Sequence, residues 1–498
     1  MPARPRVVII GAGAAGVFTA YRLRQQHGDA FEIVLLEKSD RIGGNALTTT
    51  LDFGGQPYSI DCGAQFFYKK TQASYVKLIG ELGLTSAPSA IESRATGITL
   101  WDAGANARRL WIPSQADGFL RYQPDDWSRL IAFTTFLTYA FFLDRDPSND
   151  WTQSVDDWIG ELALVDSAFK DQVLRPFLYQ FVTLPSNRIG EASARYAITY
   201  FVRNVFGEPG PNVTPHVARP GGAPTFEVYQ SRIGLDGVLK KALEASGVTS
   251  RLNEPVLAVA RNADGTLAVT TTSETIAADH VVLATDPPTS AAILTAGSFP
   301  RPGLIGALQQ CEYAPLPIAM QNGNPGWMPG DAEYWEAVNT VVDGDALSFS
   351  VWFGPLRDAF AGDQRIPVFK SWASPALDPS ASPATFFSHT HHILMPTTTF
   401  MAARGAVLAR QGQDNLWFAG GWTTWFDSQE AALDSATVVA LALGGPPAAA
   451  ARRSDVTTPP LTDAQDAIEG WLARAVAHAP DAYRRRLLRV VAEVESKG

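Results

Sequence analysis

The ten residues VVIIGAGAAG, at positions 7–16, constrain this chain more than any other stretch. Four apolar residues form a short run typical of a buried strand, and Gly11, Gly13 and Gly16 follow at the spacing G-x-G-x-x-G. In a dinucleotide site the first glycine permits a tight turn, and the second lets the backbone approach a pyrophosphate. The third lets a helix pack closely on the strand. The stretch therefore predicts a strand, a phosphate-binding turn and a helix start.

The residues that follow supply the context that this spacing requires. An alanine-rich segment over residues 14–27 favours a helix, and a second apolar run over 31–36 ends at Glu37. The N-terminus of the helix offers unpaired N–H groups to phosphates, and an acid after the second strand can accept hydrogen bonds from ribose hydroxyls. We therefore predict a Rossmann-type α/β unit that binds a dinucleotide.

Composition narrows the class of protein. The 498 residues are 46% hydrophobic and 18% charged, which is typical of a compact chain with more than one domain. A formal net charge of -10 argues against nucleic acid as the main partner. Cys62 and Cys311 are the only cysteines, which excludes a disulfide framework and a cysteine cluster for a metal. We expect a cytoplasmic protein without integral membrane insertion, for which a homodimer is one of the assemblies left open.

Residues 130–143, LIAFTTFLTYAFFL, form a long apolar run. A bilayer needs about 20 such residues, so this run does not predict a membrane span. A buried helix is one interpretation, and the lining of an apolar tunnel or a contact with a membrane surface is the other.

Further glycine-rich turns follow strand-like segments along the chain. Arg41, Gly43 and Gly44 form a second loop directly after the second strand, and SIDCGAQF follows at 59–66. Near the end, a short apolar strand at 416–419 precedes a glycine pair and a helix over 428–443. Between these parts we expect helices at 72–82, 128–143, 155–164 and 192–205, a loop at 207–224, a hairpin at 256–271 and a strand at 279–286.

The distribution of these segments predicts the domain organisation. Residues 91–230 are rich in aromatic residues and have mostly helical patterns, while residues 301–404 have strand-like patterns. We interpret both regions as inserts that build one α+β substrate domain. A linker rich in Pro and Ala over 446–460 precedes two amphipathic helices, expected to pack on the body or on a second subunit. We predict a discontinuous dinucleotide-binding domain (1–90, 231–300, 405–445), a substrate domain (91–230, 301–404) and a helical extension (446–498).

The motifs GAGAAG, DRIGGN, GLDG, VVLATDPP and LWFAGGWTTWFDSQEAALDSA stand in an order that resembles the flavin-containing amine oxidase and phytoene-desaturase-like superfamily. The resemblance covers roughly residues 5–445. Over 310–442 the chain looks most like a bacterial group of NAD/FAD-binding oxidoreductases whose substrates are mostly undefined. The resemblance implies a two-domain flavoprotein with FAD extended along the first domain and its isoalloxazine ring at the domain interface.

The resemblance also implies a set of FAD-binding residues. The first glycine loop would bind the pyrophosphate, Glu37 the adenosine ribose, Val256 the adenine, and the helix after Ser428 the pyrimidine edge of the flavin. Because no cysteine follows the late glycine pair, we expect FAD to bind without a covalent bond. Because the sequence contains only one dinucleotide fingerprint, we expect no dependence on nicotinamide. The implied cofactor-binding residues are Gly11, Gly13, Ala14, Ala15, Gly16, Glu37, Lys38, Arg41, Gly43, Gly44, Asn45, Gly63, Ala64, Gln65, Phe66, Val256, Ala284, Thr285, Gly420, Gly421, Gln429 and Glu430.

The chain departs from the family in two places. Many members carry Arg where this chain has Asn45, which predicts a weaker phosphate contact. Amine oxidases commonly place a lysine, through a water, at flavin N5 from a strand of the substrate domain. Lys370 is the only lysine available after Lys241 and before the glycine pair, and its context, VFKSWASP, does not resemble the family's lysine strand.

The catalytic candidates are His389, His391 and Trp422. In an extended strand, His389 and His391 of the motif HTHH share one face, and His392 takes the other. No third ligand on that face supports a metal site, so we interpret one of the two as a base or hydrogen-bond donor, with structural hydrogen bonding as the alternative. Trp422 stands where an aromatic wall beside the flavin is expected, and packing between domains is the alternative. Further pocket candidates are Trp352, Tyr179, Tyr196 and Tyr200.

These residues predict an FAD-dependent oxidoreductase that takes a hydride from a hydrophobic or unsaturated small organic substrate. The flavin would be reoxidised by oxygen or another acceptor. An aromatic, lysine-poor substrate domain favours apolar substrates, so small primary amines are expected to be poor ones. Three alternatives stay open: an amine or amino-acid oxidase, a redox-neutral double-bond isomerase, and an FAD-binding protein without enzymatic activity.

Overall fold

The structure is a computed structural model of the whole chain. It describes residues 4–53, 55–63, 67–68, 71–85, 91–146, 148, 150–182, 184–206, 226–324, 326–356, 368–373, 379–444, 468 and 472–496. The expected loop at 207–224 and the linker at 446–460 lie outside these residues.

A five-stranded parallel sheet with strand order β19-β13-β1-β2-β9 confirms the predicted Rossmann-type unit. Its middle strands are nearly continuous runs of buried Val, Ile and Leu, as a parallel sheet covered on both faces requires. Segments far apart in the sequence meet here, because after β2 the chain leaves the sheet and returns to it at β9, at β13 and at β19. The strands are β1 (Arg6–Ile10), β2 (Glu32–Leu36), β9 (Ser250–Arg251), β13 (His280–Leu283) and β19 (Leu416–Phe418).

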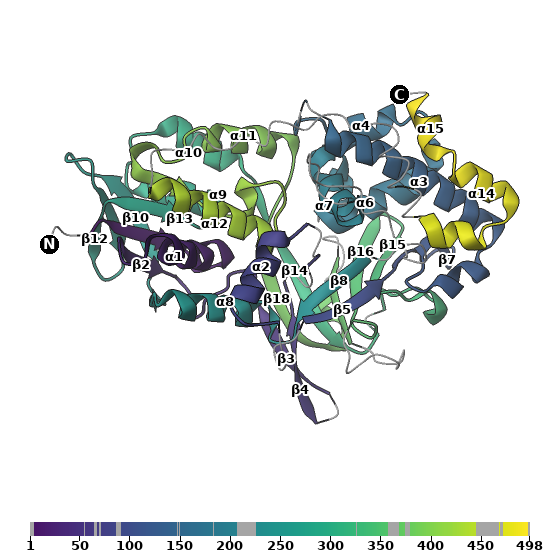
Figure 1. Cartoon of the computed structure of the whole chain (residues 1–498), viewed down its shortest axis with the longest axis horizontal. Helices are drawn as coiled ribbons and strands as arrows, with labels where there is room; N and C mark the ends of the chain where they lie inside the picture. Colours follow the sequence, from purple (N-terminus) through teal and green to yellow (C-terminus); the bar gives the residue numbers. More distant parts are fainter. Residues whose placement is uncertain are drawn as a thin grey trace.

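Helices and a small antiparallel sheet cover this parallel sheet (Figure 1). Helix α1 begins and ends at the predicted residues and contacts both α12 and α8, while α12 also contacts α2. The small sheet β10-β11-β12 contains the predicted hairpin, with Gly265 at a positive φ in its turn. These elements are α1 (Ala14–His27), α2 (Ala73–Glu81), α8 (Gly234–Ser246), α9 (Pro287–Ala296), α10 (Pro302–Gln310), α11 (Thr398–Leu408), α12 (Gln429–Leu443), β10 (Val256–Arg261), β11 (Leu267–Thr271) and β12 (Thr275–Ala278).

The second large sheet is a mixed sheet of seven strands, with strand order β18-β14-β17-β16-β15-β6-β7. All neighbours are antiparallel except β15 and β6. The two expected inserts therefore meet in one sheet. Its strands are β6 (Ile98–Asp102), β7 (Ala107–Ile112), β14 (Tyr313–Asn322), β15 (Val338–Asp343), β16 (Ala346–Trp352), β17 (Val368–Ala373) and β18 (Thr385–Leu394). Two separate ribbons are β3 (Thr48–Phe53) with β4 (Gln56–Asp61) and β5 (Ile91–Thr96) with β8 (Phe226–Ser231).

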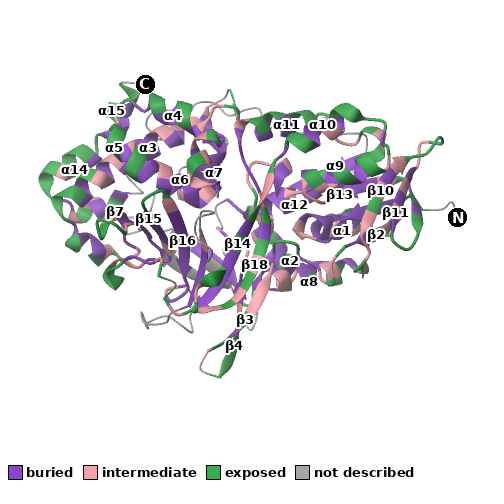
Figure 2. Ribbon diagram, turned by 180° about the vertical axis from the view of Figure 1, so that it is seen from behind, coloured by how far each residue is buried: buried purple, intermediate pink, exposed green. Residues whose placement is uncertain are grey.

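Helices pack against this sheet, and Figure 2 shows buried residues concentrated between the two layers. Helix α6 contacts β15 and β16, and α3 contacts α7 and β7. The tail helices contact α3, which agrees with the expectation that they pack on the body. The helices of this layer are α3 (Pro124–Arg145), α4 (Val155–Glu161), α5 (Ser167–Phe169), α6 (Arg175–Val182), α7 (Ala194–Phe206), α14 (Asp481–Leu487) and α15 (Val490–Glu495).

The long apolar run at 130–143 belongs to α3 and is the buried helix of the first interpretation. Gln123 and Asp126 form a capping box at its N-terminus, and most of its apolar side chains belong to the core. None of its residues lines the large cavity described below, so the tunnel interpretation is wrong. Of the helices that the structure describes, none is long and apolar enough to cross a membrane.

Candidate functional site

One cavity of about 1290 Å³ extends from the carboxyl end of β1 to the seven-stranded sheet. This volume exceeds the ~300–1,000 Å³ of an ordinary ligand pocket, so the cavity has room for a large cofactor and a second molecule. Most of the residues that the resemblance implied for FAD line it. They are Gly11, Gly13, Ala14, Ala15, Glu37, Lys38, Arg41, Gly43, Gly44, Asn45, Gly63, Val256, Ala284, Thr285, Gly420, Gly421 and Gln429.

Two glycine loops form a cradle at one end of the cavity. Gly11 adopts φ +99°, and a Cβ at this position would lie 2.8 Å from the Ala284 carbonyl oxygen. A Cβ on Gly13 would meet only Gly44 Cα, at 3.9 Å, so the backbone at Gly13 is open toward the cavity. The second loop packs on the first, because Gly43 N–H donates to the Ala12 carbonyl oxygen at 2.8 Å. Backbone N–H groups without side-chain cover suit a pyrophosphate.

Glu37 closes the cradle at the end of β2. Its Oε2 accepts from Ala12 N–H at 2.8 Å, and its Oε1 accepts from Ser39 N–H at 3.0 Å and from the Ser39 hydroxyl at 2.6 Å. The carboxylate is buried and lines the cavity. These bonds fix its orientation, while its remaining lone pairs can accept from a ligand hydroxyl.

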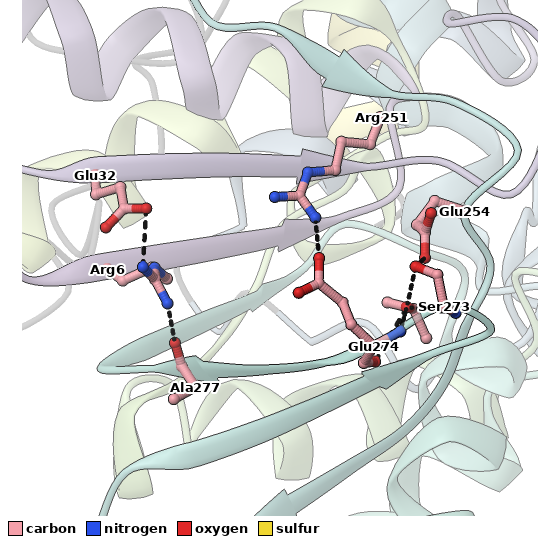
Figure 3. A network of polar contacts seen from close by, with 8 residues as sticks. Arg6, Glu32, Arg251, Glu254, Ser273, Glu274 and Ala277 are labelled. Carbon is pink, nitrogen blue, oxygen red and sulfur yellow. Dashed lines mark hydrogen bonds and ion pairs between the residues drawn. The ribbon is translucent and has the colours of Figure 1, made fainter.

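A polar network supports the loop at 252–255, which runs beside Glu37. Figure 3 shows the side chains of Arg251, Glu254, Ser273 and Glu274 in this network. Glu37 N–H donates to the Arg251 carbonyl oxygen, and Glu254 N–H donates to the Glu37 carbonyl oxygen, each at 2.9 Å. The side chains of Arg251 and Glu254 bind Glu274 and the Ser273 hydroxyl in the turn between β11 and β12. Because Glu254 lines the cavity, the small antiparallel sheet helps to shape this end of it.

The late glycine pair and the start of α12 form the middle of the cavity. Ser428 caps the helix, since its Oγ accepts from Ala431 N–H at 3.2 Å. The indole ring of Trp422 lies against Gly420, is buried and lines the cavity. Gln429, in the first turn of α12, also lines it. The helix N-terminus therefore points its partial positive charge at this part of the cavity.

Several expected site residues have other positions. Glu430 does not line the cavity, because its two carboxylate oxygens accept from Ser74 and Tyr75 N–H and cap α2. Gly16 lies under α1, where a Cβ would come within 1.9 Å of the Gly11 carbonyl oxygen, so it serves packing and not the cavity wall. Two of the aromatic pocket candidates do not line the cavity: Trp352 packs on Trp335, and Tyr179 belongs to the core. Ala64, Gln65 and Phe66 lie outside the described residues.

Lys370 lies on β17 and lines the cavity, although its sequence context argued against it. The side chain is 2% exposed, and its Nζ donates to the Gly63 carbonyl oxygen at 2.7 Å. Burial lowers the pKa of Lys370 to about 8, with Cys62 and Asp61 acting against that shift. Alternation along VFKSWA, which puts Lys370 and Trp372 on one face, was the signal that sequence reasoning missed.

His389 and His391 share one face of β18, as expected, with ring centroids 5.1 Å apart in an edge-to-face arrangement. His391 is 3% exposed and lies beside Gly63, where a Cβ would come within 3.0 Å of His391 Cε1. Burial, followed by the charges of His389, Lys370 and Arg41, lowers the pKa of His391 to about 3. A ring this weakly basic stays neutral and accepts a proton poorly. Lys370 is therefore the better candidate for proton transfer.

The remaining part of the cavity, which we call the inner chamber, lies between the seven-stranded sheet and helices α6 and α7. Its aromatic wall includes Tyr68, Tyr196, Tyr200 and Phe426, and Phe426 stacks on Tyr200 with centroids 4.2 Å apart. Sequence reasoning included Tyr196 and Tyr200 but missed Tyr68 and Phe426. The sheet and helix side chains that line it are Ile98, Leu316, Ile318, Val338, Phe349, Val351, Lys370, Trp372, Gln180, Phe181, Val182, Phe201 and Asn204.

Comparisons with known proteins agree with this geometry. The sequence profile of the family described as flavin containing amine oxidoreductase matches residues 14–318. Polyamine oxidase 1 of Oryza sativa subsp. japonica is 43% identical over 61 residues, 12% of this chain and 11% of that protein. Coproporphyrinogen III oxidase of Mycobacterium tuberculosis is 42% identical over 77 residues, 16% of each chain. The matched stretches thus span less than a fifth of these curated relatives.

The fold is also similar to that of a solved structure. The crystal structure of a putative protoporphyrinogen oxidase from Exiguobacterium sp. 255-15 has a TM-score of 0.58 and 17% sequence identity, covering 89% of this chain and 99% of that one. At this identity the likeness concerns the fold alone.

Proposed function

Since the chain belongs to the flavin containing amine oxidoreductase family and is an FAD-dependent oxidoreductase, we propose that its substrate carries a large apolar body. A hydride equivalent would be taken from a C–H bond of that substrate. The observation that carries the proposal is the inner chamber, whose sheet wall and helix wall are both lined mainly by apolar and aromatic side chains. Such walls stabilise an apolar body in proportion to the area removed from water.

We propose that the cofactor binds along the cavity in the order implied by the sequence. The residues fit FAD, because the open backbone at Gly13 suits a pyrophosphate and the carboxylate of Glu37 suits ribose hydroxyls. The N-terminus of α12 suits the negative charge that gathers at the pyrimidine edge of a reduced flavin. The division into domains at 1–90, 231–300 and 405–445 and at 91–230 and 301–404 follows from the same proposal.

Bound FAD supplies the acceptor for a hydride equivalent. The apolar walls of the inner chamber hold the substrate body and exclude water from it. We assign Lys370 to proton transfer at its Nζ, because it is the buried, partly neutral base among the described residues of the chamber wall. The Gly63 carbonyl oxygen fixes the direction of that amine. Trp422 and the stacked pair of Tyr200 and Phe426 confine the substrate from the other side.

Amine oxidation is the second candidate, and Lys370 favours it. The expectation that small primary amines are poor substrates depended partly on the lack of a recognisable lysine, and Lys370 removes that ground. The family description and the local identity to polyamine oxidase 1 support the same candidate. An apolar amine satisfies both proposals, since its chain would lie in the inner chamber.

Anaerobic reduction of the flavin by matched compounds tests the proposal. We expect decylamine or 2-decen-1-ol to bleach the visible flavin absorbance faster than propylamine, because only the longer compounds fill the chamber. Comparison of decylamine with 2-decen-1-ol then separates amine oxidation from oxidation of an unsaturated compound. Faster reduction by propylamine than by both decyl compounds would show that an apolar body is not what the site selects.

Glu37→Ala is expected to weaken FAD binding about ten- to hundredfold. The change removes charge-assisted hydrogen bonds worth roughly 1.5–3 kcal/mol in all. Titration of the apo-protein with FAD, followed by quenching of flavin fluorescence, measures the effect. Glu37→Gln is the matched control, because it keeps an acceptor for one bond and should lose less affinity. Equal affinity of Glu37→Ala and the unsubstituted protein would contradict the assignment.

A further inference from the structure

Asp427 places a carboxylate in the cavity without any partner among the described residues. Its side chain is exposed and lines the cavity. No hydrogen bond or ion pair reaches its carboxylate oxygens from the part of the chain that the structure describes, although its backbone N–H donates to the Tyr196 hydroxyl oxygen at 3.4 Å. The protein atoms around the carboxylate raise the pKa of Asp427 to about 6, because they replace part of its water. A bound cofactor would remove the remaining water, and the carboxylate would then need a hydrogen-bond donor from that cofactor.

The cap of α12 does not explain Asp427. Ser428 caps this helix, since its Oγ accepts from Ala431 N–H. Glu430, three residues further on, caps α2. Asp427 is therefore the one acidic side chain in this turn that is not engaged in holding the described structure together.

Gly421 makes room for this carboxylate. A Cβ on Gly421 would lie 2.2 Å from Asp427 Oδ1, so any larger residue there would displace the carboxylate. Both residues line the cavity. Gly421 follows β19, in the same parallel sheet as β1 and the glycine cradle, while Asp427 N–H donates to Tyr196 of the inner chamber. A dinucleotide extended from that cradle toward the inner chamber would pass this point with the part that joins its pyrophosphate to its flavin ring. In FAD this part is the ribityl chain, which carries hydroxyl groups and no charge.

We propose that the Asp427 carboxylate accepts hydrogen bonds from the ribityl hydroxyls of FAD, in the space that glycine at position 421 leaves free. The described side chains near Asp427 include Tyr196 and Tyr313, and no cation among the described residues affects the pKa of its carboxyl. Neutral hydroxyl donors satisfy a carboxylate without adding a charge to the cavity. The inference concerns the cofactor only, and it holds whatever the substrate class is.

Titration of the apo-protein with three probes tests the proposal. For Asp427→Ala we expect FAD and riboflavin to bind about tenfold more weakly or worse, because both carry the ribityl chain. ADP, which carries only the other half of the cofactor, should bind with unchanged affinity. Unchanged thermal unfolding of the apo-protein would show that the fold is intact. Asp427→Asn, which keeps one acceptor oxygen, should lose less affinity than Asp427→Ala.

A relocation variant gives the sharper comparison. Because a side chain at position 421 would grow into the place of the Asp427 carboxylate, Gly421→Asp combined with Asp427→Gly should recover part of the lost FAD affinity. Gly421→Asp alone, with two carboxylates in one space, should bind FAD more weakly than the double variant. Unchanged FAD affinity in Asp427→Ala would overturn the proposal, and a loss confined to decylamine binding would assign the carboxylate to a substrate ammonium group instead.

Discussion

Lys370→Met is expected to lower the rate constant of flavin reduction by about a hundredfold or more while FAD stays bound. General acid–base groups typically contribute 10²–10⁴-fold to a rate, and Lys370 is the buried base that the structure brings to the inner chamber. Methionine keeps most of the bulk of the side chain without its charge, so the sheet around β17 should remain packed. Anaerobic stopped-flow mixing with decylamine or 2-decen-1-ol, whichever reduces the protein faster, measures the rate.

The direction in which the rate of flavin reduction changes with pH follows from the pKa of Lys370. With the pKa of Lys370 lowered to about 8, the neutral amine is the minority form at neutral pH and the majority form above about 8. If the neutral amine accepts the proton, the rate of flavin reduction should rise with pH through about 8 and then level. Lys370→Met should lose this rise. His391, whose pKa lies near 3, does not titrate in that range.

His389→Ala is the matched control for Lys370→Met. His389 lines the same wall, and burial lowers its pKa as well, but its side chain is half-buried and farther along β18 from Gly63. We expect a loss of less than about tenfold for His389→Ala. A wild-type rate in Lys370→Met with full FAD, or a larger loss in His389→Ala, would return the catalytic role to the histidines.

Local patterns were sufficient to predict the α/β fold because they act over short distances. Residues 14–27 are rich in alanine and residues 31–36 are a mainly apolar run, so α1 and β2 lie where the sequence predicts them. The glycine spacing likewise predicted a turn that only glycine can form at Gly11, where φ is +99°. These features need no knowledge of distant parts of the chain.

The site depended on tertiary contacts that no local pattern encodes. Glu430 follows Ser428 in a motif that suggests cofactor binding, yet α2, which lies more than 350 residues earlier, takes its carboxylate. The sequence around Lys370 does not resemble the family's lysine strand, so sequence reasoning argued against it. Its position is determined by the pairing of β17 with β14 and by the Gly63 carbonyl oxygen, which accepts from its Nζ. The proposed role of Asp427 depends on the finding that Ser428 caps α12, which leaves the Asp427 carboxylate available to a ligand.

Gly16→Ala is expected to destabilise the apo-protein by at least about 3 kcal/mol, the upper part of the usual cost of overpacking. The added methyl group would lie 1.9 Å from the Gly11 carbonyl oxygen, so a backbone atom rather than a flexible side chain must move. Helix α1 would be pushed off β1, and the parallel sheet would lose its central packing. Thermal unfolding of the protein without FAD measures this effect, and we expect a large fall in Tm or no soluble protein.

Gly13→Ala, three positions earlier, separates the two functions of the glycine turn. Gly13 has φ -68°, which any residue adopts, and its added Cβ would meet only Gly44 Cα at 3.9 Å. The apo-protein of this variant should therefore keep its Tm. Its methyl group would stand where the backbone approaches the pyrophosphate, so FAD and ADP should both bind far more weakly. A Tm that falls as much as in Gly16→Ala would mean that the open backbone at Gly13 serves the fold. Unchanged ADP affinity would mean that the phosphates lie elsewhere in the cavity.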